Sequence, residues 1–404
     1  MKLAFVCTEM LPSPAIKGGA IQILIDGIAP IIAERHDLSI FSITDPDLPE
    51  TEGMGRIKYI RFPRKGYSES VAEYLKNNSA NNESFDVIHV FNRPRVVSRY
   101  KRASPNCKFV LSLHNEMFHP QKINDEEGLR SLGSVETIMT VSNYIGDTVR
   151  NRFPDIKPRI QTVYSGVDLT VYVPIWAGGA RREDLRQKIG VQDKKVVLFV
   201  GRLSTKKGPH LLIEAMKEVL LKHPDAVLVI IGGRWFADNS VNDYVSELYS
   251  LAEPLGESVI FTKFVNPSDM PDYYLIGDVF VCASQWQEPL ARVHYEAMAA
   301  GLPIITTKRG GNAEVIKHSY NGIVISDYSN TEAFIKAINK VLSNPRLAFR
   351  LGKTARRVAE RNYSYERVAS ELLKIYEKAT GQPFKDRKRI RAPFKFRPRF
   401  FKRQ

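Results

Sequence analysis

The sequence predicts an α/β protein with two parallel sheets. Short apolar runs alternate with amphipathic helical stretches along most of the chain, a pattern typical of βαβ units. The two halves share one plan, because residues 3–25 and 196–216 each contain an apolar run, a glycine-bearing loop and a long helical stretch. A length of 404 residues also exceeds what one ordinary core organises. We therefore expect two doubly wound parallel-sheet domains that face each other across a cleft.

The first half contains seven predicted strands, each an apolar run bounded by polar or turn residues. The clearest helix lies between the first two of them, at residues 21–35. The predicted strands are residues 2–7, 37–43, 57–62, 86–91, 108–114, 137–142 and 160–166.

The second half repeats this alternation with six predicted strands. Its clearest helices are residues 208–223 and 241–255, where apolar residues recur with helical spacing. The predicted strands are residues 195–201, 226–233, 258–265, 279–284, 303–308 and 322–326.

A hinge is predicted at residues 171–185, because "GVDLTVYVPIWAGGARRED" interrupts both periodicities with Pro and two glycines. The expected domains are residues 1–170 and 186–380, and the last helix is a candidate to pack back on the first domain. Open parallel sheets bind ligands at the carboxyl ends of their strands. The cleft between the two sheets is therefore the expected site.

The composition indicates a soluble globular protein, with 43% apolar and 25% charged residues. No run of eighteen apolar residues predicts a transmembrane helix, and the short apolar run after Lys2 predicts a strand rather than a signal peptide. Cys7, Cys107 and Cys282 are odd in number and widely spaced, which indicates reduced thiols. We expect a cytoplasmic protein.

The C-terminal tail, residues 381–404, is a separate basic element. Its last twenty residues hold ten Lys or Arg against one Asp, which accounts for most of the net charge of +15. This composition suits contact with an anionic membrane or polymer, whereas nucleic acid is disfavoured. The alternative is a disordered, solubilising extension. Five phenylalanines lie among these charges: Phe384, Phe394, Phe396, Phe400 and Phe401.

Two carboxylates, Glu288 and Glu296, lie in the stretch "QEPLARVHYEAMAAGLPII". With a helix from about residue 290 to 300, their eight-residue separation spans roughly 12 Å. Carboxylates accept hydrogen bonds from the vicinal hydroxyls of a sugar and a ribose, and the helix start between them suits phosphates. The alternative is an ordinary row of surface ion pairs with Arg292.

Two glycine-bearing loops suit the phosphates as well. In "GRLSTKKG", which follows a strand and opens a helix, Arg202 and Lys207 are placed to neutralise phosphate oxygens. In "KGGA", Gly18 and Gly19 form a backbone anion cradle at a helix entry. A solvated loop and a structural turn are the respective alternatives.

Other enzyme classes are disfavoured. The D-x-D spacing of Asp45 and Asp47 lies in a polar loop with a central Pro, which suits a turn better than a metal site. A G-x-G-x-x-G motif does not follow the first strand, so a nicotinamide enzyme is not expected. The histidines show no metal-ligand spacing.

Taken together, the motifs resemble the retaining glycosyltransferase family 4, whose members have the two-domain GT-B fold. The resemblance runs from residue 1 to about residue 378 and implies an N-terminal acceptor-side domain and a C-terminal nucleotide-sugar-binding domain, both Rossmann-like. The wording of the last two motifs is similar to a family member from the coat of bacterial spores. The motifs are "KGGA", "SLHNEM", "TVSNYI", "YSGVD", "GRLSTKKG", "QEPLARVHYEAMAAGLPII" and "RGGNAEVI".

The resemblance implies a role for each matching residue. Glu296 would bind the ribose hydroxyls, and Glu288 the hydroxyls of the transferred sugar. The backbone at Leu290 and Ala291 would lie near the sugar and phosphate. Arg202 and Lys207 would hold the diphosphate and stabilise the departing nucleoside diphosphate.

On the opposite side of the cleft, Gly18 and Gly19 would approach the phosphates. His114, at the end of its strand, would point at the sugar near the reacting carbon, and Glu314 would lie near the nucleotide end. The segment "LARVH" departs from the family, so Arg292 and His294 are expected to enlarge or charge the donor wall and leave the identity of the sugar open.

Two functions from different classes follow. The first is a retaining hexosyltransferase that moves a sugar from a nucleotide-sugar, with UDP-linked donors favoured as the commonest in the family. It would act without an essential metal or cofactor on a glycan, lipid-linked or protein acceptor, in spore-coat or surface glycan formation. The alternative is a structural component of the spore coat that keeps the fold but has little activity.

Overall fold

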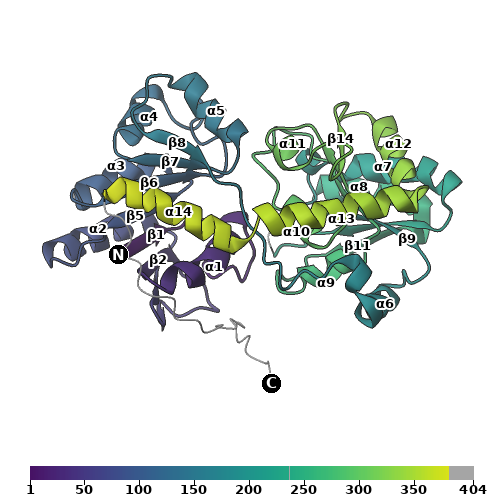
Figure 1. Ribbon diagram of the computed structural model, residues 1–404, viewed down its shortest axis with the longest axis horizontal. Helices are drawn as coiled ribbons and strands as arrows, with labels where there is room; N and C mark the ends of the chain where they lie inside the picture. Colours follow the sequence, from purple (N-terminus) through teal and green to yellow (C-terminus); the bar gives the residue numbers. More distant parts are fainter. Residues whose placement is uncertain (236, 382–404) are drawn as a thin grey trace.

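The computed structural model describes residues 1–235 and 237–381, which form two sheets flanked by helices (Figure 1). The first sheet has the strand order β3-β4-β2-β1-β5-β6-β7-β8, and the second has the order β11-β10-β9-β12-β13-β14. All neighbouring strands are parallel except β3 and β4. The predicted α/β class with two parallel sheets is confirmed.

The strands of the first sheet are β1 (Lys2–Val6), β2 (Asp37–Ile43), β3 (Thr51–Met54), β4 (Ile57–Phe62), β5 (Val87–Phe91), β6 (Lys108–Leu113), β7 (Thr137–Thr140) and β8 (Arg159–Thr162). Those of the second sheet are β9 (Lys195–Val200), β10 (Ala226–Ile231), β11 (Val259–Lys263), β12 (Val279–Cys282), β13 (Ile304–Thr307) and β14 (Ile323–Ile325).

Helices occupy most of the intervening chain. In the first half they are α1 (Ala20–Ala33), α2 (Tyr67–Ala80), α3 (Pro94–Ala103), α4 (Asp125–Leu132) and α5 (Asn143–Arg152). The later ones are α6 (Gly179–Ile189), α7 (Pro209–Lys222), α8 (Asp243–Ala252), α9 (Met270–Leu275), α10 (Val293–Ala299), α11 (Asn312–Val315), α12 (Thr331–Leu342), α13 (Pro345–Asn362) and α14 (Tyr365–Thr380).

Three elements differ from the sequence prediction. Strand β3 was not expected, because it is a mostly exposed edge strand without an apolar run. The strand predicted at 160–166 ends at Thr162, because the chain then leaves the sheet toward the second half. The helix predicted from about 290 to 300 spans only Val293–Ala299, so Leu290 and Ala291 precede it.

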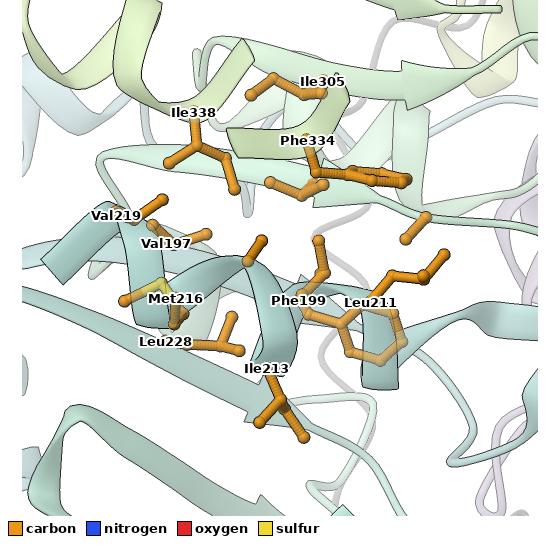
Figure 2. Close-up of a cluster of buried hydrophobic side chains, with 14 of the residues drawn as sticks. Val197, Phe199, Leu211, Ile213, Met216, Val219, Leu228, Ile305, Phe334 and Ile338 are labelled. Atoms are coloured by element: carbon orange, nitrogen blue, oxygen red, sulfur yellow. The ribbon is translucent and has the colours of Figure 1, made fainter. Parts of the chain in front are cut away.

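One apolar core holds β9 and α7, the strand and the helix that the glycine-bearing loop connects. Helices α7 and α12 pack together over the second sheet, and Figure 2 shows their side chains meeting those of β9. Val197 and Phe199 of β9, Met216 of α7, and Phe334 and Ile338 of α12 are all at most 2% exposed. The loop between β9 and α7 is therefore held at both ends by the same core.

The chain passes between the two halves twice, and the two crossings lie side by side. The N–H of Val167 donates to the carbonyl of Tyr363 at 2.9 Å. After the second crossing, α14 packs on α1, so that the last helix covers the first sheet (Figure 1). The contact is close, because a Cβ atom at Gly27 of α1 would lie 2.3 Å from the Tyr365 ring.

Helix α6 lies within and beyond the predicted hinge of residues 171–185. Arg182 Nε donates to the carbonyl of Leu275 at 2.9 Å, and Arg186 Nη1 donates to that of Ile276 at 2.7 Å. These bonds attach α6 to the second half. The first passage between the halves is therefore complete before Gly179.

The remaining sequence expectations concern the thiols, the membrane and the tail. Cys7, Cys107 and Cys282 are buried free thiols. In the described ranges, no helix is both long enough and apolar enough to cross a bilayer. Residues 382–404, which include all the basic residues of the tail, lie outside the described residues.

Candidate active site

Glu288 is a buried carboxylate at the carboxyl ends of the second sheet, in the segment that follows β12. Only 5% of the residue is exposed. Its Oε2 accepts hydrogen bonds from Lys207 Nζ at 2.7 Å, Trp286 Nε1 at 2.8 Å and Ser284 Oγ at 2.9 Å. Among the described residues no donor reaches Oε1, so one carboxylate oxygen remains available for a further donor.

The environment of Glu288 keeps it ionised. Burial acts to raise the pKa of the carboxyl, but the Lys207 ammonium and the hydrogen bonds from Ser284 and Trp286 together hold that pKa below its usual range. A negative charge is thus fixed beside a positive one in a largely buried site. Such a pair suits a polar ligand whose own charges and hydroxyls match it.

Two further cations flank this pair in the loop after β9. The Arg202 guanidinium lies 4.4 Å from the centre of the Trp235 ring, and burial lowers its pKa while the negative charge of Glu288 opposes that effect. Lys206 is exposed and lies over the Trp286 ring at 5.3 Å. Lys207 therefore points inward to Glu288, whereas its neighbour Lys206 stays at the surface.

Glycines bring these loops into close contact. Gly208, at a φ of 70°, begins α7 so near Ala283 that a Cβ atom would lie 2.3 Å from the Ala283 carbonyl oxygen. A Cβ atom at Gly310 would lie 2.0 Å from the carbonyl oxygen of Glu288, to which Gly311 N–H donates at 2.8 Å. The loops after β9, β12 and β13 thus form one tightly packed unit.

Leu290 and Ala291 lie between this unit and α10. Ala291 is 6% exposed, and its N–H makes a long contact of 3.3 Å with Asn312 Oδ1. Asn312 is fully buried, and its Nδ2 has no hydrogen-bond partner in the part of the chain that the structure describes. The backbone before α10 is therefore held close to α11.

Glu296 lies on α10, one helix segment away from Glu288. It is 8% exposed, and its Oε2 accepts a hydrogen bond of 2.8 Å from Tyr274. Arg292 Nη2 lies 3.4 Å from Oε1. The same guanidinium bonds Ser165 Oγ, the Gly166 carbonyl and the Tyr365 hydroxyl, each at 3.2 Å. Arg292 therefore joins α10 to both crossings between the halves.

The expectation that His294 lines the donor wall is wrong. His294 is fully buried, with Nε2 at 2.8 Å from Thr306 Oγ1 and Nδ1 at 3.0 Å from the Ala291 carbonyl. The expected wall position of Arg292 is likewise replaced by its contacts at the crossings. Helix α10 is buried on all sides from His294 to Ala299, which explains why its side chains face the core.

His114 approaches the same region from the first half, where it follows β6. Its N–H donates to Asn92 Oδ1 at 3.0 Å. Burial lowers the pKa of His114 to about 3, and the positive charge of Arg292 acts in the same direction, so the imidazole is neutral. Its Nε2 is buried and finds no hydrogen-bond partner among residues 1–235 and 237–381.

Gly18 and Gly19 lead into α1, also in the first half. Both have a positive φ, 80° and 100°, which favours glycine. A Cβ atom at Gly19 would lie 2.6 Å from Gln22 Oε1 and 2.6 Å from Leu11 Cδ1. Gly18 and Gly19 are therefore buried, and the side chains of Gln22 and Leu11 leave no room for a larger residue at position 19.

Glu314 bridges the two halves, which the sequence did not suggest. Its Oε1 accepts from Tyr144 N–H at 2.8 Å, and its Oε2 accepts from Asn143 N–H at 2.8 Å and from the Tyr164 hydroxyl at 2.9 Å. Both oxygens are thus engaged at the N-terminus of α5, where a negative charge is favourable. Its carboxylate thus binds the first half, and the expectation that Glu314 lies near the nucleotide end stays a prediction.

Comparison with known proteins places this geometry in a family. The family model of Glycosyltransferase Family 4 matches residues 25–171, and that of Glycosyl transferases group 1 matches residues 181–358. The chain is 48% identical over 380 residues to Spore coat protein SA of Bacillus subtilis (strain 168), covering 94% of this chain and 100% of that protein. The chain belongs to glycosyltransferase family 4. This glycosyltransferase is also 52% identical over 379 residues to YtcC of the same organism, covering 93% and 92% of the two chains.

Solved structures agree with the fold of this glycosyltransferase. Sucrose-phosphate synthase from Thermosynechococcus elongatus has a TM-score of 0.77 at 21% identity, covering 94% of this chain and 99% of that one. Anabaena Alr3699/HepE in complex with UDP-glucose has a TM-score of 0.73 at 20% identity, covering 94% and 100%. The predicted GT-B fold is confirmed.

The sequence predicted some of the side chains that meet in this glycosyltransferase and missed others. The structure brings Lys207 and Glu288 into contact and places Arg202 beside them. Sequence reasoning missed Trp286, Ser284 and Tyr274, which fix the two glutamates. The sequence offered one signal for Trp286, which lies two residues before Glu288. The N–H of a buried indole usually has a hydrogen-bond acceptor, and the nearby carboxylate is a candidate for it.

Proposed function

We propose that this glycosyltransferase is a retaining hexosyltransferase that uses a nucleotide-sugar, with UDP-linked donors favoured. Membership of family 4 supports the transfer reaction. The similarity in fold to Anabaena Alr3699/HepE, which was solved with UDP-glucose, is consistent with a UDP-linked donor. The acceptor would be a glycan, a lipid-linked molecule or a protein in spore-coat or surface glycan formation, in keeping with the 48% identity to Spore coat protein SA.

The observation that carries this proposal is the buried Glu288–Lys207 pair with Arg202 beside it. Glu288 keeps one oxygen for a sugar hydroxyl, while Lys207 has further N–H groups after its bond to Glu288. Arg202 and Lys207 would neutralise the diphosphate and stabilise the charge that develops as it leaves. Preorganised donors in such positions contribute about 10²–10³ to kcat each.

Other residues of the site would contact the remaining parts of the nucleotide-sugar. Glu296 would accept from the ribose hydroxyls, and the backbone at Leu290 and Ala291 would lie along the sugar and phosphate. Gly18 and Gly19 would approach the phosphates from the first half, at the entry of α1, where both residues have a positive φ. Glu314 would lie near the nucleotide end, with both its oxygens bound to the first half.

The reaction itself needs little from side-chain nucleophiles. His114 is neutral and carries an unsatisfied Nε2, which suits a hydrogen bond to the sugar rather than a charge. The acceptor oxygen would then bond to the anomeric carbon on the face from which the diphosphate leaves, as the bond between that carbon and the phosphate oxygen breaks. The proton of the acceptor hydroxyl would pass to the departing diphosphate, and the anomeric configuration would be retained. Arg202 and Lys207 supply positive charge to the leaving group, and we expect transfer to continue in EDTA.

The direct test is donor turnover by the full chain. UDP-, GDP- and ADP-sugars would be incubated with the protein, with and without EDTA, and the released nucleoside diphosphate measured. A bound donor at a hundred times its Kd should stabilise the fold by about 2.7 kcal/mol, which a thermal-shift assay detects. Lys207→Ala should lower turnover about 10²–10³-fold, whereas Lys206→Ala, a matched change one residue away, should retain it. Equal turnover in both variants would contradict the assignment.

A second candidate is a structural component of the spore coat. The near full-length identity to Spore coat protein SA favours it. A coat component without activity would release no nucleoside diphosphate from any sugar nucleotide and would show no donor-dependent thermal shift. Detection of the protein in purified coat fractions, together with that negative result, would select this candidate over the transferase.

A further inference from the structure

The outer face of α13 carries a row of positively charged side chains. Its five exposed Lys or Arg residues follow one another at intervals of four, three, four and four positions. At 100° per residue they fall within an arc of about 80°, and at 1.5 Å per residue the row is about 22 Å long. The opposite side of the helix is buried against the second half. The row consists of Arg346, Arg350, Lys353, Arg357 and Arg361.

None of these five charges forms an ion pair in the part of the chain that the structure describes, although Glu360 lies on the same helix. Within the described ranges, the ion pair on α13 is Arg356 with Glu360, and none of the five residues of the row lies within 4.0 Å of an acid. Helix α3 provides the contrast, because its Arg95 pairs with Glu127 and its Arg99 with Glu69. The α13 row is thus a concentrated positive field, whereas that of α3 is partly neutralised.

Exposed aromatic side chains border this row. Phe349 of α13 is 52% exposed, and Trp176 is 42% exposed and packs edge-to-face against it, with 5.8 Å between ring centres. Lys353 lies 5.2 Å from the Phe349 ring centre. A Cβ atom at Gly301 would lie 2.4 Å from the Trp176 ring, so the indole is supported from beneath. Packing contacts therefore hold both rings in place at the surface.

We propose that this α13 face, defined by the five basic residues with Trp176 and Phe349, docks the protein on an anionic lipid surface. The inference is independent of the proposed transfer reaction, since no residue of the face belongs to the donor site. Basic residues are attracted to a membrane surface by its negative potential. Trp and Phe side chains prefer the interface between headgroups and acyl chains. Helix α13 lies on the near face of the molecule in Figure 1, with no other element drawn in front of it.

A lipid surface fits this face better than a nucleic acid does. Single-stranded nucleic acids bind in a positively charged groove that offers ring faces for stacking. Here the basic row lies on the outward side of a helix, and Trp176 and Phe349 meet at an angle of 71°, which leaves no parallel stacking platform. A row of charges flanked by aromatic rings matches a broad, planar, negatively charged layer.

The test measures binding of the full chain to vesicles. Vesicles of phosphatidylcholine with 30% phosphatidylglycerol would be compared with pure phosphatidylcholine by co-sedimentation. Each basic residue near an anionic surface changes the partition coefficient about fivefold. The triple variant Arg350→Gln, Lys353→Gln, Arg357→Gln should therefore bind the anionic vesicles about a hundredfold more weakly.

A control with the same loss of charge separates this face from a general effect. The triple variant Arg95→Gln, Arg99→Gln, Arg102→Gln on α3 should lose less than fivefold, because that helix lies on the other half and is partly ion-paired. Equal losses in the two triple variants would overturn the proposal, and so would failure of the wild-type protein to bind anionic vesicles. Preferential binding of a single-stranded oligonucleotide through the α13 row would overturn it too.

A second readout reports the orientation. Brominated lipids should quench the fluorescence of the bound wild-type protein, and Trp176→Phe should remove most of that quenching. Persistence of full quenching in Trp176→Phe would show that another face meets the lipid and would refute the assignment. Donor-dependent thermal shifts of all variants should match the wild type, so failure of lipid binding and failure of the proposed transferase activity remain distinguishable.

Discussion

The buried pair of Lys207 and Glu288 gives a prediction whose size follows from the structure. Lys207→Met removes the ammonium 2.7 Å from Oε2 and leaves a carboxylate that is 5% exposed. Loss of one partner of a buried ion pair costs about 3–5 kcal/mol. Because Ser284 and Trp286 still donate to Glu288, we expect the lower end, about 3 kcal/mol. At about 2–4 °C per kcal/mol, the Tm should fall by roughly 6–12 °C.

The dependence on pH checks the cause of this loss. The folded-state pKa of Glu288 is depressed, so its contribution to stability is present above the unfolded pKa and is lost as pH falls through the folded pKa. Without Lys207 that depression disappears. The stability difference between wild type and Lys207→Met, measured by urea unfolding, should therefore be largest near neutral pH and should shrink toward pH 3.

Two variants test the reasoning. Lys206→Met changes the exposed neighbour and should alter the free energy of unfolding by less than about 0.5 kcal/mol. The double variant Lys207→Met with Glu288→Gln should recover part of the loss, since it removes the unpaired charge. If Lys207→Met unfolds at the wild-type urea concentration at every pH, the pair does not stabilise the fold as argued.

Three further predictions concern the donor site and the contact between the halves. Glu296→Gln should weaken binding of a nucleotide-sugar at least tenfold in isothermal titration, and an unchanged Kd would remove its proposed ribose role. Glu314→Ala deletes three hydrogen bonds to the first half, so the domains should separate more often, with a larger radius of gyration in small-angle scattering and a higher donor KM; an unchanged radius would argue against a bridging role. Gly27→Ala places a methyl group 2.3 Å from the Tyr365 ring and should cost about 1–3 kcal/mol in thermal unfolding, whereas a neutral result would mean that α14 shifts freely.

The sheets were predictable because buried parallel strands are local features. Runs such as residues 195–200 and 226–231 are apolar on both faces and are bounded by loops, so one window of sequence identifies each. Strand β3 was not, because Thr51–Met54 has no apolar run and owes its conformation to pairing with β4. The last helix was a candidate to pack on the first domain, but the contact between Tyr365 and Gly27 that fits α14 to α1 has no local pattern in the sequence.

The site was predictable only to the level of segments. The loop of Arg202 and Lys207 and the segment of Glu288 follow neighbouring strands, so their meeting follows from parallel topology. The bond of Arg292 to Gly166 joins residues 126 positions apart, and the bond of Glu314 to Asn143 joins residues 171 positions apart. Only the folded chain brings such distant residues together. The burial of His294 had no clear local sign, because its helix also carries Glu296 and is nevertheless buried from His294 to Ala299.

The placement of α14 has a consequence for the order of synthesis. The first sheet is complete in sequence at Thr162, yet the helix that covers its exposed side begins only at Tyr365. At about 5–20 residues per second, the ribosome adds the intervening stretch of roughly 200 residues in about 10–40 s. Throughout that interval the apolar side chains that later pack against α14 stay uncovered, so we expect the N-terminal half to reach its full stability only after α14 has been made.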